Sequence, residues 1–255
     1  MNYSHISFIG GGRIVRILLH AFESYGQKFD TIKVYEKDEN VLLKLQEVFP
    51  EIQAASLSDA LRSDLVFFAL HPPMLSDLLD KIDDELTPDA TFISLAPKIS
   101  INQLSKALHS GKIVRMIPTA TSFINEGFCP VAFSTHISGE EKKAVLSLLH
   151  VTGQVFETDE SKLGAYVIAS AMLPTYFWYQ MQEIKLVAQQ SGLSDSESRN
   201  AVCQSLIAAA KLFNREDLSY DELTDLIPAK PMSQAEPIMR GLYKDVLPEL
   251  YKKVR

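Results

Sequence analysis

Three consecutive glycines, Gly10, Gly11 and Gly12, follow a short apolar run near the start of the sequence. A glycine between a strand and a helix permits a tight turn, and another lets a pyrophosphate approach the backbone closely. The free N–H groups and the dipole of the following helix would favour the phosphate charge. The full dinucleotide-binding pattern is not met, because Val15 stands at its third glycine position. Taken alone, the triplet is a weak signal that a purely structural turn would also explain.

Glu36 stands at the end of the next strand-like run, residues 31–35, where dinucleotide-binding domains carry an acidic residue. A carboxylate at this position would bond the ribose hydroxyls of NAD and repel the 2′-phosphate of NADP. Lys37 follows directly and could pair with that phosphate instead. Both residues could also be solvated charges at the end of a strand. The pair therefore leaves the choice between NAD(H) and NADP(H) open.

A third candidate is the tripeptide His71-Pro72-Pro73, which follows the apolar run 64–70. Ligands of open α/β sheets bind beyond the carboxyl ends of the strands, so this loop should line the cofactor site. His71 could contact the nicotinamide ribose or the substrate. It could equally be a solvated loop histidine in front of a proline that starts a helix.

These residues depend on strands that alternate with helices from residue 5 to about residue 117. The predicted strands are 5–9, 31–35, 64–70, 91–95 and 112–117, followed by 129–133 and 154–158. Helical periodicity is visible between them, and Ser100 with Gln103 forms a capping-box signature, as Ser138 does with Glu141. This order predicts an α/β fold with a parallel sheet and helical crossovers.

The pattern changes to helices alone after about residue 158. Residues 162–190 form one long helical pattern that Pro174 should kink or split. Ser194 and Glu197 cap the next predicted helix, which reaches Phe213, and further helices are expected at 219–226 and 233–253. We therefore expect two domains, residues 1–158 and residues 159–255.

Composition limits the class of protein. With 255 residues, 46% of them hydrophobic, the chain can bury a sizeable core, and its net charge of −7 makes nucleic acid an improbable partner. The most apolar stretch, residues 166–179, is too short to cross a bilayer, and the N-terminus lacks the pattern of a signal peptide. Cys129 and Cys203 fit no metal or redox spacing. We expect a cytoplasmic protein with neither a metal site nor a membrane partner.

The segments that carry these features resemble the pyrroline-5-carboxylate reductase family in order and spacing. The similarity is strongest in ISFIGGGRI (6–14), FFALHPP (67–73), ISLAPKISINQL (93–104) and VRMIPTATSFINEG (114–127). It is weaker in AYVIASAMLPTYF (165–177) and SLIAAAKLF (205–213). Positions of the family motifs are occupied by Arg115, Pro118, Glu126, Gly127 and Pro174.

The resemblance implies an N-terminal Rossmann-like, doubly wound parallel sheet domain followed by an all-α C-terminal dimerisation domain. It implies a homodimer or higher homo-oligomer that reduces the imine of 1-pyrroline-5-carboxylate to L-proline with NADPH or NADH. The residues that we assign to the cofactor are Gly10, Gly12, Arg13, Ile14, Glu36, Lys37, Leu70, His71, Pro72 and Ala96.

The departures from the family concern the substrate side. His71 replaces a lysine and Thr119 an asparagine, and the residues before Pro174 are bulkier than the family's glycine-rich stretch. The family's Ser-Pro-Gly-Gly-Thr-Thr loop, which holds the substrate carboxylate, corresponds to residues 229–235, where only the proline is retained. Loss of its glycines costs backbone freedom and weakens a nest of N–H groups.

Replacements for that loop can be named from the residues present. Lys230 could supply charge to the substrate carboxylate, and Ser233 or Gln234 could supply a hydrogen bond. Candidates for proton delivery, and thus for catalysis, are Thr119, Ser233 and Lys230, besides a bound water. Substrate contacts are expected from Pro118, Met172, Leu173 and Met232.

Three functions are consistent with the sequence. The first is reduction of 1-pyrroline-5-carboxylate, and the second is reduction of another small imine or keto substrate in a reshaped pocket. The third is a dinucleotide-binding protein that has lost catalysis, which the missing Gly-Gly-Thr-Thr favours.

Overall fold

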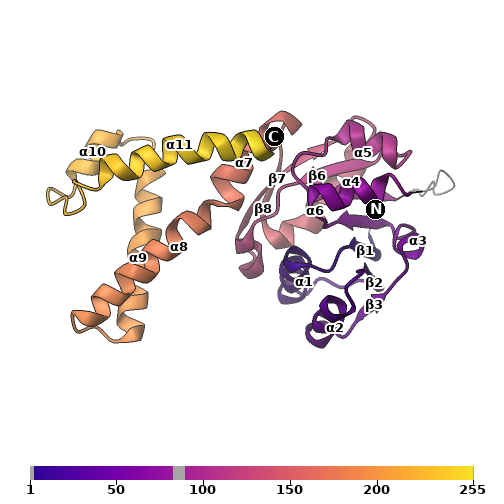
Figure 1. Ribbon diagram of the computed structural model, residues 1–255, viewed down its shortest axis with the longest axis horizontal. Helices are drawn as coiled ribbons and strands as arrows, with labels where there is room; N and C mark the ends of the chain where they lie inside the picture. The colour runs from indigo at the N-terminus through magenta and orange to yellow at the C-terminus, as the bar shows by residue number, and fades with distance from the viewer. Residues whose placement is uncertain (1–2, 83–89, 255) are drawn as a thin grey trace. The chain divides into compact units, whose positions relative to one another are not determined.

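One mixed sheet organises the first part of the chain in the computed structural model, which describes residues 3–82 and 90–254. Within these residues, eight strands lie in the order β3-β2-β1-β4-β5-β6-β7-β8 (Figure 1). Their bounds are β1 His5–Ile9, β2 Thr31–Tyr35, β3 Ile52–Ala54, β4 Leu65–Phe68, β5 Thr91–Ser94, β6 Ile113–Met116, β7 Gly127–Phe133 and β8 Gly153–Glu157. The chain order reverses between β1 and β4, which is the switch point where ligands of such sheets bind.

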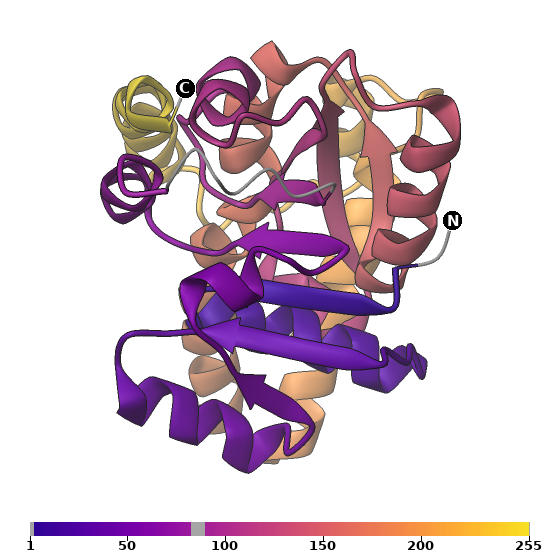
Figure 2. The same ribbon diagram turned by 90° about the vertical axis from the view of Figure 1, so that its right-hand side faces the viewer.

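Helices cover both faces of the sheet (Figure 2). They are α1 Arg13–Tyr25, α2 Glu39–Val48, α3 Leu57–Ala60, α4 Pro72–Leu79, α5 Ile101–Ala107 and α6 Gly139–Leu149. Strand β4 is buried along its whole length, with Leu65 and Phe67 in the core under α1, α2 and α6. Val66 and Phe68 point to the opposite core, under α3, α4 and α5. Two-sided burial explains the continuous apolar run and confirms the predicted doubly wound α/β fold.

The last two strands depart from the parallel arrangement. β7 pairs antiparallel with β6, and β8 pairs parallel with β7. Gly127 and Gly153 face each other at the start of this β7–β8 ribbon. A Cβ on Gly127 would lie 2.5 Å from the carbonyl oxygen of Thr152, and Gly153 has a φ of +126°. The ribbon can begin here only because both residues lack a side chain.

Three of the predicted helices begin at the capping boxes that the sequence indicated. Both hydrogen bonds of the capping box form at Ser100 with Gln103, at Ser138 with Glu141 and at Ser194 with Glu197. A further capping box joins Ser219 to Glu222. β3 and α3 were absent from the prediction, since three and four residues are too short for a periodic signal.

The expected helix over residues 162–190 is divided, as Pro174 predicted. A short α7, Leu163–Tyr166, is followed by a π-helical turn, Val167–Ala171, and α8 runs over Leu173–Gln190. Pro174 is the second residue of α8, where a missing N–H leaves no intrahelical bond unmade. The π-helical turn and Met172 thus separate α7 from α8, two residues before the proline.

Contacts within the chain define two compact units. The sheet unit extends to Met172 and includes the chain from Leu250 onward, whereas the helical unit is Leu173–Glu249. The predicted boundary near residue 158 differs from this division. Its physical reason is burial: Leu163 and Val167 lie in one core cluster with Ile117 of the sheet unit.

The helical unit comprises α8 together with α9 Asp195–Phe213, α10 Tyr220–Asp225 and the greater part of α11, Glu236–Val254. Many large apolar side chains of this unit are exposed in the single chain, among them Trp178, Val187, Ile207, Phe213, Ile227 and Leu242. None of the helices in the described residues is both long and apolar enough to cross a membrane.

Candidate functional site

A cavity of about 540 Å³ lies in the sheet unit, at the carboxyl ends of β1, β4, β5 and β6. It is the position that the strand order assigns to a ligand. Ten of the residues predicted to bind cofactor or substrate line it, namely Gly10, Gly12, Arg13, Ile14, Glu36, Leu70, His71, Pro72, Pro118 and Met172. The structure therefore gathers into one cavity residues that are dispersed over the sequence.

The fold requires glycine at position 10 but not at position 12. Gly10 has a φ of +102°, and a Cβ there would lie 2.9 Å from the carbonyl oxygen of Ala69. The turn after β1 therefore requires glycine for structural reasons alone. Gly12 has an ordinary φ of −72°, and no described atom lies within 4 Å of where its Cβ would be. The fold does not require this second glycine, which leaves open space for a ligand at the start of α1.

The N-terminus of α1 favours an anion. No side chain caps it, and its first residue, Arg13, adds a positive charge where the helix dipole is already positive. A bound phosphate would accept hydrogen bonds from the free N–H groups and would neutralise both the charge of Arg13 and the positive end of the helix dipole. Val15, at the third glycine position, is completely buried in the core under α1, so the helix packs on the sheet without that glycine.

Glu36 is held against the glycine loop by backbone groups. Gly11 N donates to Oε2 at 2.7 Å, and Asp38 N donates to Oε1 at 3.0 Å. Lys37 lines a smaller cavity of about 120 Å³ that shares Glu36 with the larger one. This second cavity also contains Asp77 and Lys81, which come from α4 and the turn after it. The sequence did not indicate these two residues, because they are close to Glu36 only in the fold.

The other end of the main cavity is apolar. It is formed by Leu95 and Pro97 after β5, Ile117 and Pro118 after β6, and Val167, Ala171 and Met172 around the π-helical turn. π-helical turns occur frequently at functional sites. Ala96, which was predicted to touch the cofactor, is only 2% exposed and is not among the lining residues; its N–H donates to Ser94 Oγ.

The predicted catalytic residues are not brought together within one unit. Thr119 belongs to the sheet unit, where it is 2% exposed and does not line the cavity. Its Oγ1 lies 3.0 Å from Thr121 Oγ1 and 3.9 Å from Cys129 Sγ. Sequence could place this residue after β6 but could not show that its hydroxyl points inward.

Lys230, Met232 and Ser233 lie together in a groove of about 580 Å³ within the helical unit. Arg240 and Tyr220 also line this groove, and Arg240 Nη2 donates to Tyr220 Oη at 3.0 Å. Neither was predicted, since α10 and α11 carry no recognisable motif there. Leu173, another predicted substrate contact, is 41% exposed at the start of α8.

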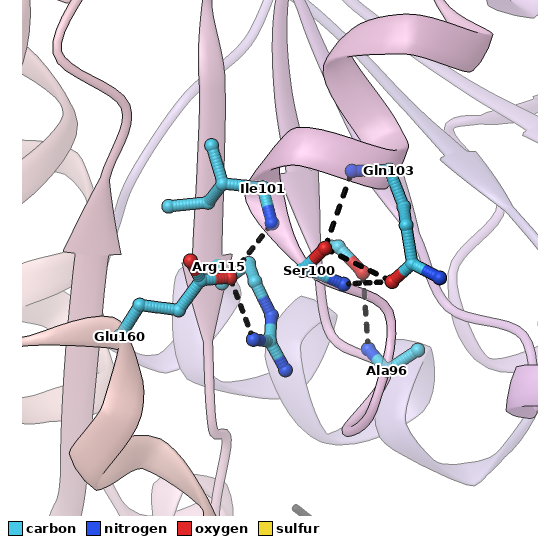
Figure 3. A network of polar contacts seen from close by, with 7 residues as sticks. Ala96, Ser100, Ile101, Gln103, Arg115 and Glu160 are labelled. Carbon is cyan, nitrogen blue, oxygen red and sulfur yellow. Dashed lines mark hydrogen bonds and ion pairs between the residues drawn. The ribbon is translucent and has the colours of Figure 1, made fainter.

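Arg115 and Glu160 form an ion pair beside the cavity wall (Figure 3). Arg115 Nη1 donates to Glu160 Oε1 at 2.8 Å, and the N–H of Ile101 donates to the same oxygen at 2.7 Å. Arg115 is 7% exposed, and its Nε has no partner among the described atoms. The pair thus fixes the chain just before α7 to β6 and to the start of α5. Glu160 was not predicted, because no local pattern connects it with a residue on β6.

Comparison with known proteins agrees with this geometry. Residues 5–98 match the family model described as "NADP oxidoreductase coenzyme F420-dependent". The pyrroline-5-carboxylate reductase of Haemophilus influenzae is 24% identical over 214 residues, which are 83% of this chain and 79% of that protein. The family description agrees with the predicted cofactor, NADP(H) or NAD(H).

Solved structures support the same fold. The 1-pyrroline-5-carboxylate reductase of Streptococcus pyogenes has a TM-score of 0.78 at 16% identity, with 98% of this chain and 97% of that chain covered. The Plasmodium falciparum pyrroline carboxylate reductase with NADP bound has a TM-score of 0.77 at 17% identity, covering 100% and 96%. These findings confirm the resemblance to the pyrroline-5-carboxylate reductases.

Proposed function

We propose that this chain is an NAD(P)H-dependent reductase of a small cyclic imine, with 1-pyrroline-5-carboxylate as substrate and L-proline as product. The observation that carries the proposal is the single cavity that joins the glycine loop to an apolar end. Its glycine-loop end has the open space, the N–H groups and the positive charge that a pyrophosphate needs. The names of the similar proteins support the choice of substrate.

Each part of the cavity has a defined role in this proposal. Gly12 and Arg13 hold the pyrophosphate, and Glu36 accepts hydrogen bonds from the ribose. Ile117 and Met172 provide apolar contacts that orient the reacting ring and exclude water. Reduced nicotinamide, when bound, supplies the hydride.

In this proposal the substrate is bound by residues that the sequence indicated. Lys230 attracts the carboxylate, and Ser233 donates a hydrogen bond to it. An imine nitrogen can arrive already protonated, so a strong acid is not obligatory. Where a proton is needed, Ser233, Lys230 or a bound water delivers it, whereas Thr119 is buried outside the cavity. Pro118 and Met172 shape the cavity of the sheet unit around the ring.

A different imine or a keto compound is the second candidate substrate. The observation that favours it is the groove containing Lys230, Met232 and Ser233, which presents bulky side chains in place of a glycine-rich loop. A site of this kind suits a substrate without a carboxylate, because fewer backbone N–H groups are available to an anion.

The decisive experiment follows the absorbance of NADH and of NADPH in the purified protein. 1-Pyrroline-5-carboxylate is compared with 1-pyrroline, which has the same ring without the carboxylate. Turnover of the carboxylate alone supports the proposal, and turnover of the plain imine alone supports the second candidate. Binding of nucleotide without turnover of either compound contradicts the first proposal and leaves another imine or keto substrate, or a non-catalytic dinucleotide-binding protein.

A homodimer or higher homo-oligomer completes the proposal, as does a cytoplasmic location in which both thiols stay reduced. The exposed side chains of Trp178, Val187 and Ile207 support assembly, because apolar surface of this extent favours burial against a second copy. Ala208 and Ala209 on α9 are likewise exposed in the single chain and would allow close approach of helices. Sedimentation that shows only monomer would contradict this part.

A further inference from the structure

We infer that the nucleotide site selects NADH over NADPH, and that Glu36 is the residue that determines this selectivity. The inference rests on the proposed function, since it concerns the same site. Sequence alone left open whether Glu36 binds the ribose hydroxyls of NADH or Lys37 binds the 2′-phosphate of NADPH. The structure separates them by how firmly each side chain is held.

The carboxylate of Glu36 is fixed from two sides. Its Oε2 accepts the N–H of Gly11 at 2.7 Å, and its Oε1 accepts the N–H of Asp38 at 3.0 Å. Both donors belong to the backbone and cannot follow the side chain if it moves. Gly11 is buried, so departure of Glu36 would leave a buried N–H without an acceptor, which proteins avoid.

The stem of Glu36 is also confined by the loop. A Cβ on Gly11 would lie 3.4 Å from both Cβ and Cγ of Glu36, so the glycine backbone packs directly on that side chain. The carboxylate therefore keeps its place beside the cavity whether the nucleotide carries a 2′-phosphate or not. Selectivity follows from this fixed position.

The chemistry of the two nucleotides differs at this point. Each carboxylate oxygen can accept two hydrogen bonds, and each uses one for the loop. Glu36 therefore retains capacity for the ribose hydroxyls of NADH, which donate hydrogen bonds. A 2′-phosphate has lost that hydroxyl and brings a negative charge toward a carboxylate that cannot withdraw. The like charges disfavour NADPH.

The cations of the neighbouring cavity do not reverse this preference. Lys37 and Lys81 are exposed and solvated, and Asp77 adds a second negative charge to the same cavity. Glu36 is half-buried and is the one charged group of this cavity that also lines the main cavity, where Arg13 stands at the start of α1. Exposed lysines on long flexible stems contribute less than a carboxylate fixed at the binding position.

The test measures equilibrium binding without any substrate, by titrating the full-length protein with NADH and with NADPH and recording nucleotide fluorescence. We expect NADH to bind roughly tenfold or more tightly than NADPH. Glu36→Gln keeps the size of the side chain and removes its charge, so the ratio of the two dissociation constants should fall toward unity. Lys37→Ala tests the competing residue that the sequence also assigned to the cofactor, and the inference expects it to leave the ratio unchanged.

Outcomes of the titration bear differently on the two proposals. The inference is overturned if NADPH binds as tightly as NADH or more tightly. It is also overturned if the Glu36→Gln variant keeps the wild-type ratio of dissociation constants. Neither result contradicts the proposed reductase function. A Lys37→Ala variant that loses NADPH affinity alone shows that Lys37 reads the phosphate, and this also overturns the inference. Failure of both nucleotides to bind overturns the proposed function as well. The thermal midpoint of each variant, measured alongside, shows whether it is folded.

Discussion

Arg115 on β6 donates a hydrogen bond from Nη1 to Glu160 Oε1 at 2.8 Å, across 45 positions of the sequence. Because the same oxygen accepts the N–H of Ile101, one carboxylate neutralises a buried cation and also satisfies the first N–H of α5. Glu160 stands at the start of the short helical turn Glu160–Lys162, which comes directly before α7. This ion pair therefore fixes that turn to β6 and to the start of α5.

Glu160→Ala should lower the free energy of unfolding by about 2 kcal/mol, because Arg115 would stay buried without its counter-charge. Urea denaturation followed by far-UV circular dichroism measures the change. Lys162→Ala is the control, since its ion pair with Asp159 at 3.0 Å is exposed on both sides and should matter little. Equal effects of the two substitutions would contradict a structural role for Glu160.

Gly10 and Gly12 should respond differently to alanine. Gly10→Ala forces a side chain onto a positive φ and against Ala69, so we expect a loss of roughly 3 kcal/mol of stability. Gly12→Ala should cost at most about 1 kcal/mol, the difference between the two residues as helix N-caps. The Gly12 variant should nevertheless bind nucleotide roughly tenfold or more weakly, because its methyl group occupies the space for the pyrophosphate.

Thermal unfolding and nucleotide titration of the same two variants distinguish these effects. A Gly12→Ala protein with wild-type affinity would show that the space before α1 is not used by the ligand. Gly26→Ala, at the left-handed C-cap of the same helix, controls for strain away from the cavity.

Glu141 should make stability depend on pH. Hydrogen bonds from the backbone and hydroxyl of Ser138, with a smaller contribution from Lys112 at 3.1 Å, hold the pKa of Glu141 below its ordinary value. A carboxyl group with a lowered folded-state pKa stabilises the fold at neutral pH. This contribution is lost as the pH falls below about 4.3, the ordinary glutamate value, and through the folded-state pKa.

Glu141→Gln should therefore be less stable than the wild type by about 1 kcal/mol at pH 7, and the difference should disappear in acid. Denaturant unfolding at several pH values measures it. Glu140→Gln, one residue earlier and exposed, should show no such dependence. A constant difference between Glu141→Gln and wild type at all pH values would mean that charge is not responsible.

Lys230→Ala tests the substrate side of the proposed function. Loss of the ammonium group should raise KM for 1-pyrroline-5-carboxylate roughly tenfold with little change in kcat, because a charge-assisted contact to the carboxylate is removed. Lys244→Ala, an exposed lysine on α11, is the control, and an unchanged KM for the carboxylate would exclude this role for Lys230.

The parts of the fold that sequence predicted are those that depend on neighbouring residues. The run 5–9 forms β1, which is buried on both faces from Ile6 to Ile9, and Gly10 follows because the turn needs a positive φ. The capping boxes bring together residues three positions apart. Such signals are local, and the cofactor half of the cavity could be predicted from them.

Other features depend on contacts that no local pattern carries. The antiparallel pairing of β7 follows from the path of the connection after β6, and its residue types suit either direction. Glu160 meets Arg115 only once the sheet has formed. Thr119 follows a strand whose end could turn its hydroxyl either to the cavity or to the core, and the structure buries it.

Gly127 and Gly153 limit the substitutions that this protein can accept. A side chain on Gly153 would collide with the backbone of Gly127, and a side chain on Gly127 would collide with the carbonyl oxygen of Thr152, so no substitution at one position can be compensated at the other. If both codons were randomised and folded variants were selected, glycine should be recovered at each position. Neither residue is among those around the 540 Å³ cavity, so this restriction on mutation would persist even if the cofactor or the substrate changed.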